Sequence, residues 1–160
     1  MIITKKLGMI GGLIAFFLAF FSEIPVYIPE GWVIDFKIFT LSDTEFYFWG
    51  YLINQNKSYS SLLLQFPENI FALTIWVSIT LIGLILIMAS TKRAKFSNSK
   101  LLFKISILLI MYLITLFSII ILIQLIIDIT KIFVVLGLGF YLTLGILIIN
   151  IFTLRSLKIE

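Results

Sequence analysis

Long runs of apolar residues, rarely broken by polar ones, dominate the pattern along this chain. A helix rising about 1.5 Å per residue needs about 20 apolar residues to cross a hydrocarbon core of about 30 Å. Four stretches meet that length, at residues 7–24, 70–89, 101–127 and 132–154. They predict an all-α membrane protein in which a four-helix transmembrane bundle forms one integral membrane domain over residues 1–160.

Helix-breaking and polar residues mark the ends of these runs. Pro25 ends or kinks the first run, and Pro67-Glu68-Asn69 suits the start of the second. Only residues 128–131 separate the third run from the fourth, which is enough for a tight helical hairpin. Within that connection, Asp128 and Lys131 are three residues apart, a spacing that suits a local ion pair.

The segment between the first two runs, residues 26–69, has a different pattern. Apolar and polar residues alternate from Trp32 to Leu41, and a second β-prone run covers Phe46 to Ile53. A period of two is typical of a half-buried strand. With a polar turn at residues 42–45, the two runs predict a small β-hairpin. Residues 59–66 resemble a short interfacial helix or hinge leading into the second apolar run.

The composition agrees with lipid as part of the solvent. Hydrophobic residues make up 61% of the chain and charged residues 12%, whereas soluble domains average about 45–50% and about 25%. The chain has neither cysteine nor histidine, which excludes disulfides, zinc-finger spacings and imidazole catalysis. No two carboxylates share a run, and no phosphate-binding glycine loop follows a strand. We therefore expect no enzymatic activity, no cofactor and no metal site.

Basic residues gather at one set of run ends. Nine of the twelve lie before the first run, around the connection between the second and third, or after the fourth. The positive-inside rule then predicts cytoplasmic termini and an extracytoplasmic segment 26–69, in a protein of the cell membrane. These cations face lipid headgroups, so we expect no nucleic-acid partner. Residues 19–21 are a poor signal-peptide cleavage site, which favours an uncleaved first helix.

Polar and small residues inside the runs predict how the helices pack. Gln124 and Asn150 each lie about one turn from the end of a run, and glycines and alanines form stripes in the first and fourth runs. Such stripes let helix backbones approach closely, either within one chain or at a dimer seam. The predicted packing residues are Gly8, Gly11, Gly12, Ala15, Ala19, Gln124, Gly137, Gly139, Thr143 and Gly145.

Aromatic residues concentrate in segment 26–69, and two uses are open for them. They can form an interfacial belt packed over the helix ends, or a docking surface for a partner protein or lipid-like ligand. The candidate partner surface is made of Trp32, Phe46, Phe48, Trp49 and Tyr51. In the same segment, Asn56-Lys57-Ser58 is an acceptor sequence for N-glycosylation at Asn56.

In layout the chain resembles claudin-type tetraspan proteins, with four spans and a large first loop. Their loop cysteines and Trp-Gly-Leu-Trp motif are missing around Trp49-Gly50-Tyr51, so no family or residue role is carried over. We expect a structural, accessory or partner-binding subunit in contact with lipid and with other membrane subunits or a second copy. The alternative is an oligomeric channel or transporter component for a small solute or ion.

Overall fold

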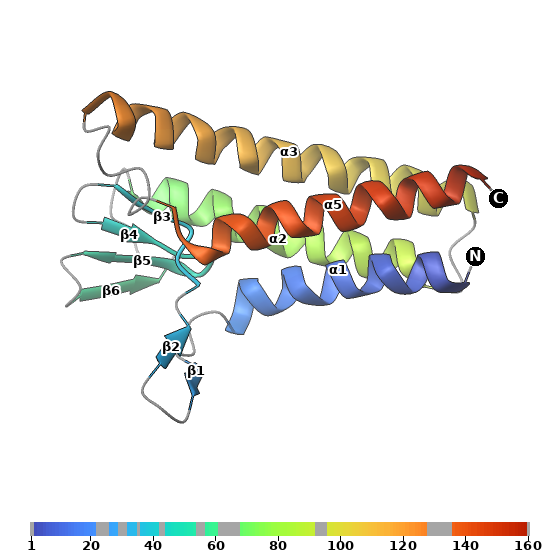
Figure 1. Ribbon diagram of the computed structural model, residues 1–160, viewed down its shortest axis with the longest axis horizontal. Helices are drawn as coiled ribbons and strands as arrows, with labels where there is room; N and C mark the ends of the chain where they lie inside the picture. The colour runs from blue at the N-terminus through green and yellow to red at the C-terminus, as the bar shows by residue number, and fades with distance from the viewer. Residues whose placement is uncertain are drawn as a thin grey trace.

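The computed structural model describes residues 2–21, 26–28, 32–34, 36–41, 44–53, 57–60, 68–91, 96–127 and 136–159. Over these residues the chain is mostly helical (Figure 1). The described helices are α1 (Ile2–Phe21), α2 (Glu68–Ser90), α3 (Phe96–Ile127) and α5 (Leu138–Ile159). Three of them, α2, α3 and α5, are long and apolar enough to cross a membrane, while the apolar part of α1 is the shorter stretch Lys6–Phe21.

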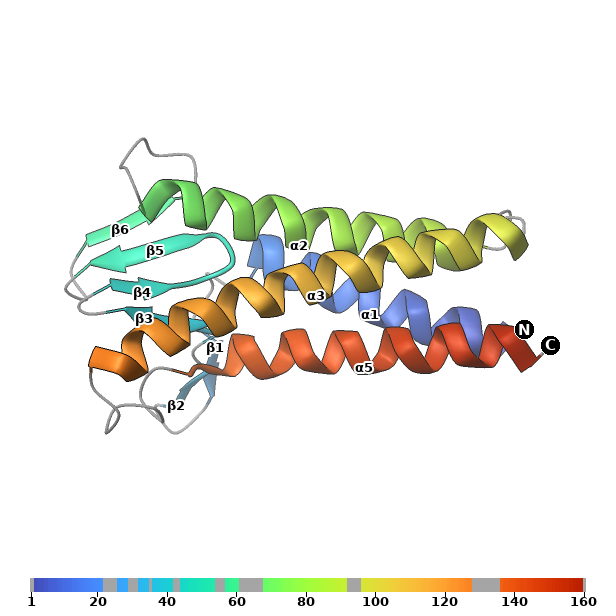
Figure 2. The same ribbon diagram turned by 90° about the horizontal axis from the view of Figure 1, so that it is seen from above.

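The helices form a ring in which α1 contacts α2, α2 contacts α3, α3 contacts α5, and α5 contacts α1. Consecutive members of the ring run in opposite directions (Figures 1 and 2). Both chain termini lie at one end of the ring with the end of α2 and the start of α3, and we call this the terminal end. The strands lie at the opposite end, which we call the sheet end.

Two antiparallel sheets occupy the sheet end. The smaller is a hairpin of β1 (Val26–Ile28) and β2 (Trp32–Ile34). The larger has four strands in sequence order, β3 (Phe39–Leu41), β4 (Thr44–Phe46), β5 (Gly50–Ile53) and β6 (Lys57–Ser60). Because β3 contacts α3 and β5 contacts α2, this sheet caps the bundle rather than standing apart from it (Figure 2).

The single predicted hairpin was wrong in extent, because both of its strands are divided. The run 32–41 supplies β2 and β3, which belong to different sheets. The run 46–53 turns at residues 48–49, where the Tyr47 N–H donates to the Gly50 carbonyl at 2.8 Å. Residues 44 and 45, expected in a turn, lie in β4, and residues 59 and 60, expected in a short interfacial helix or hinge, lie in β6. Residues 61–66 are outside the described part of the chain.

Backbone pairing with α5 explains why the first predicted strand is interrupted. The carbonyls of Lys37 and Ile38 accept the N–H groups of Gly139 and Gly137, at 2.8 and 2.9 Å. These carbonyls therefore serve the start of a helix instead of a neighbouring strand. A period of two in the sequence predicts an extended backbone but not the partner of its hydrogen bonds.

The helix bounds differ most from the predicted runs at α1, α3 and α5. Helix α1 begins at Ile2 rather than at residue 7. Helix α3 begins at Phe96 rather than at residue 101, because a helix can continue through polar residues beyond its apolar part. Helix α5 begins at Leu138 rather than at residue 132: Leu136 makes an isolated antiparallel bridge with Phe39, and Gly137 is not helical. Residues 22–25 and 128–135, with the predicted Asp128–Lys131 pair, lie outside the described residues.

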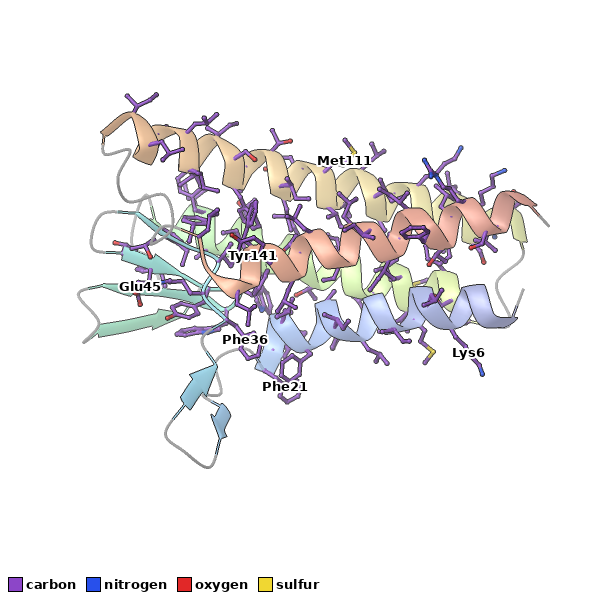
Figure 3. The ribbon with its side chains drawn as sticks, viewed as in Figure 1. Lys6, Phe21, Phe36, Glu45, Met111 and Tyr141 are labelled. Atoms are coloured by element: carbon purple, nitrogen blue, oxygen red, sulfur yellow. The ribbon has the colours of Figure 1, made fainter. Side chains whose placement is uncertain are left out.

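Apolar side chains fill the centre of the ring. Buried positions on α3 follow alternating spacings of four and three residues, as expected for helices that cross at a small angle. They are Ser99, Phe103, Ser106, Ile110, Leu113 and Phe117, each with no exposed surface. The outward faces are apolar as well; Leu108 is 67% exposed, and Met111 points away from the bundle (Figure 3). Apolar outward faces of this kind suit a membrane, because lipid hydrocarbon is as apolar as the side chains themselves.

Candidate functional site

Close backbone approach joins α1 to α2 at two glycines. A Cβ atom on Gly12 would lie 3.1 Å from the backbone nitrogen of Ile87, and one on Gly83 would lie 3.2 Å from that of Phe16. The other predicted packing residues of α1 also face neighbours: a Cβ on Gly8 would meet Phe103, one on Gly11 would meet Ile149, and Ala15 and Ala19 are buried. Gly83 was missed because it has no small residue one turn away to complete a stripe.

An indole group holds the end of α1. The Trp76 Nε1–H of α2 donates to the Ala19 carbonyl at 3.1 Å, and the Trp76 ring meets Phe20 edge-on with centroids 5.8 Å apart. The last carbonyls of a helix have no partner within that helix. An unsatisfied carbonyl is costly in hydrocarbon, so this bond stabilises the contact between α1 and α2.

The start of α5 is built on two glycines that receive the chain segment before β3. A Cβ on Gly137 would collide with the Lys37 carbonyl, and one on Gly139 would lie 2.5 Å from the Phe36 carbonyl. Thr143, one turn further on, is buried and donates to the carbonyl of Gly139 at 2.9 Å. Gly145 differs, because a Cβ there would meet nothing within 4 Å. Three of the four packing residues predicted for the fourth run, Gly137, Gly139 and Thr143, therefore lie against the rest of the chain.

A column of aromatic rings runs from the sheet into the bundle. Phe39, Phe46 and Tyr51 are cross-strand partners, with ring centroids 4.9 Å apart for the first two and 6.0 Å for the last two. Phe39 also lies 5.7 Å from Phe117 of α3, which lies 6.3 Å from Phe140 of α5. The column joins the sheet to two helices, so the sheet end is filled by rings.

The structure places the candidate partner surface largely inside this packing. Phe46, Phe48 and Tyr51 are between 0 and 2% exposed, so these three rings are covered by the chain itself. Trp49 is half-buried and stacks on Tyr47 with centroids 5.6 Å apart. The side chain of Trp32 lies outside the described part of the structure.

A charged cluster flanks the aromatic column at the sheet end. Lys37 Nζ lies 3.3 Å from Glu45 Oε1, and the Tyr47 hydroxyl donates to Glu45 Oε2 at 3.3 Å (Figure 3 labels Glu45). The two charged side chains are only 17–18% exposed. The cluster was missed because Glu45 was placed in a turn, where it would have been solvated. It fixes the segment before β3 to β4.

A buried polar layer lies nearer the terminal end. The Asn150 Nδ2 of α5 donates to the Ser106 Oγ of α3 at 3.0 Å, and neither side chain has exposed surface. Asn150 was among the polar residues noted from the sequence, but Ser106 and the buried Ser90 and Ser99 were missed. The four-and-three spacing that places Ser99 and Ser106 on one face with Phe103 was the signal that could have found them.

Most hydroxyl groups of the helices bond to their own backbone. Thr74, Thr80, Thr115, Ser118 and Thr153 each donate to the carbonyl four residues earlier, at 2.7–2.9 Å. These groups are satisfied without a neighbour or a solute. Two further candidates stay predictions: Gln124 lies in α3 but its side chain is not described, and Asn56 falls outside the described residues.

Among the described residues, histidine, cysteine and acidic side chains form no group of three that could hold a metal ion. Within the described ranges, the site-forming interactions are side-chain packing, capping of helix ends, one ion pair and one buried amide layer. Comparison with models of known families, with curated proteins and with solved structures finds no match to this chain.

Proposed function

We propose that this chain is a four-span membrane subunit that acts by structure and by contact with partner proteins, without catalytic chemistry of its own. The observation that carries this proposal is that buried apolar side chains fill the centre of the bundle. Ile79, Ile82, Ile110, Leu113 and Phe117 have no exposed surface and occupy the middle of the ring. A pore through one chain needs polar groups along its length, so this packing counts against a pore within the single chain and favours a scaffold. An oligomeric channel or transporter component for a small solute or ion is the alternative.

The fourth span in this proposal is α1. Its 20 residues correspond to about 30 Å of helix, and it lies along α2 and α5, both of which are long enough to cross a membrane. Its apolar part begins at Lys6, whose exposed side chain lies near the terminal end (Figure 3). A lysine there can extend its ammonium group to the headgroups while its stem stays in lipid.

The orientation in this proposal follows from charge, with the terminal end in the cytoplasm and the sheet outside. Two single-cysteine variants of α3 test it, because the chain has no cysteine of its own. Asn98→Cys lies exposed at the terminal end, and Ile126→Cys, at an 85% exposed position, lies at the sheet end. An impermeant maleimide on intact cells should label only Ile126→Cys; labelling of only Asn98→Cys would reverse the orientation.

The partner-binding role is tested by a photo-crosslinking amino acid on the outward faces of the bundle. Suitable positions, one on each helix, are 43–67% exposed: Leu13, Leu84, Leu108 and Phe152. The fully buried Phe117 is the matched control. We expect a discrete protein adduct from one face, none from the opposite face, and none from position 117.

Flux measurements test the alternative function, an oligomeric channel or transporter component. Purified protein in liposomes should pass ions and small solutes no faster than empty liposomes do. Saturable flux, with no protein adduct from any outward position, would overturn the subunit proposal in favour of the channel or transporter component.

A further inference from the structure

Three buried polar atoms near the terminal end have no hydrogen-bond partner among the described residues. They are Oγ of Ser90, Oγ of Ser99 and Oδ1 of Asn150. Ser99 and Asn150 have no exposed surface, and Ser90 is 7% exposed. Buried polar atoms in native proteins are almost always satisfied, so this cluster indicates a ligand with hydrogen-bonding groups.

The Asn150 side chain defines what that ligand must offer. Its Nδ2 donates to Ser106 Oγ at 3.0 Å, whereas its Oδ1, which can accept two hydrogen bonds, accepts none from the described residues. Turning the amide over would exchange the roles of the two atoms and leave the nitrogen unsatisfied instead. Either orientation leaves one polar end of a fully buried amide in need of a small partner that can donate and accept.

The unsatisfied atoms extend from the end of the helices inward. Ser90 is the last residue of α2, and Ser99 lies in the first turn of α3. Ser106 is seven residues beyond Ser99 on the same buried face, or about 10 Å along the helix. Gly8 lets the Phe103 ring and Ser90 Oγ approach α1 closely, because a Cβ there would lie 2.5 Å from the ring and 2.8 Å from the hydroxyl oxygen.

The next residues of the same face close the site toward the sheet end. Ile110, Leu113 and Phe117 follow Ser106 on α3, and all three are buried and apolar. Apolar cavities stay dry, while polar ones hold water that makes two to four hydrogen bonds. Phe103 lies between Ser99 and Ser106 on this face and is also buried and apolar, so water at Ser99 and water at Asn150 would occupy separate places, and neither would continue toward the sheet end.

We propose that the terminal end of the bundle contains a water-binding site in which bound water donates to Asn150 Oδ1, with further water at Ser99 and Ser90. The ligand is water because the described atoms that line the site are neutral hydroxyl and amide groups, with no charged side chain among them in the described part of the chain. Buried apolar residues lie beyond Asn150 toward the sheet end, so the site does not form a path across the membrane.

Nuclear magnetic resonance on the full chain in lipid nanodiscs tests the site. Isotope-labelled asparagine gives five side-chain amides, from Asn54, Asn56, Asn69, Asn98 and Asn150. The Asn150 signals are assigned by their loss in Asn150→Gln or, if that variant does not fold, by replacing the other four asparagines in turn. We expect cross-relaxation between water and the Asn150 amide protons.

Two internal controls make the result decisive. The exposed Asn98 amide should show contact with water, which proves that the measurement works. In a sample with labelled tryptophan as well, the Trp76 indole N–H, already bonded to the Ala19 carbonyl, should show none. Contact with water at Asn150 supports the site; a dry Asn150 in a sample where Asn98 is wet overturns it.

Discussion

The two ends of the bundle are built from different side chains on the same four helices. At the sheet end, aromatic rings from β3, β4, α3 and α5 stack into a column, with Phe117 at its centre. At the terminal end, the same face of α3 carries Ser99 and Ser106 around Phe103, and α5 contributes Asn150. One end is held by ring packing, and the other places polar groups where lipid cannot reach them.

This difference indicates where the chain can tolerate change. In a membrane the burial of apolar surface contributes little to helix association, because lipid is as apolar as the core, so packing and hydrogen bonds decide it. The ring column and the backbone contact at Gly139 give the sheet end many well-fitted contacts. Among the described residues, the terminal end has one interhelical hydrogen bond, between Asn150 and Ser106, beside the close approaches of Gly8 to Phe103 and of Gly11 to Ile149.

The largest expected effect on the free energy of unfolding comes from truncating two buried phenylalanines of α3, one near each end of the bundle. Phe117→Ala should lower the free energy of unfolding by about 3–5 kcal/mol, because it leaves a cavity among rings. Phe103→Ala should cost roughly 1 kcal/mol less, because water can enter the space beside the polar layer. Unfolding in mixed detergent micelles measures both, with the 62% exposed Phe152→Ala as a near-neutral control. Equal costs at positions 103 and 117 would contradict a difference between the ends.

The next largest effect on stability should distinguish two glycines of α5. Gly139→Ala should destabilise the protein by about 2 kcal/mol, because its Cβ would lie 2.5 Å from the Phe36 carbonyl and the backbone must shift. Gly145→Ala should leave stability unchanged or raise it by up to about 1 kcal/mol, since a Cβ there meets nothing within 4 Å. Thermal unfolding in detergent measures the pair. A stable Gly139→Ala would show that the segment before β3 is not fixed to α5.

The runs of apolar residues predicted the helices but not their inward faces. In a soluble helix the buried side is apolar and the other is polar, so the sequence shows which face is which. Here Leu108 faces outward and Leu113 inward, and both are leucine because lipid and core are equally apolar. For the same reason Ser99 and Ser106 could not be recognised as core residues from hydropathy alone.

The strands were predictable only as extended chain. Alternation from residue 32 to residue 41 indicated a β conformation, and β2 and β3 lie within that run. The division between them depends on Gly137 and Gly139, about 100 residues later, whose N–H groups bind the Lys37 and Ile38 carbonyls. Likewise, the burial of Phe46 and Tyr51 depends on helices that no local pattern places beside them.

A smaller effect tests the hydrogen bond that links α3 to α5. Asn150→Ala, Ser106→Ala and the double variant should give a coupling energy of about 1 kcal/mol, the usual range for such bonds between membrane helices. The measurement is again unfolding in mixed micelles, analysed as a double-mutant cycle. Additive effects of the two changes would mean that the polar layer does not hold the terminal end together.

The smallest effect concerns the ion pair at the sheet end. Lys37→Met, Glu45→Gln and the double variant should show a coupling of about 0.5 kcal/mol, because removing the two largely buried charges from water offsets most of their attraction. Glu45→Gln retains an acceptor for the Tyr47 hydroxyl, so the change isolates the charge. The coupling should change little at high salt, because salt screens a largely buried pair only weakly. If it instead equals or exceeds the cost of Phe117→Ala, then charge rather than ring packing holds the sheet to the bundle, and the contrast between the two ends fails.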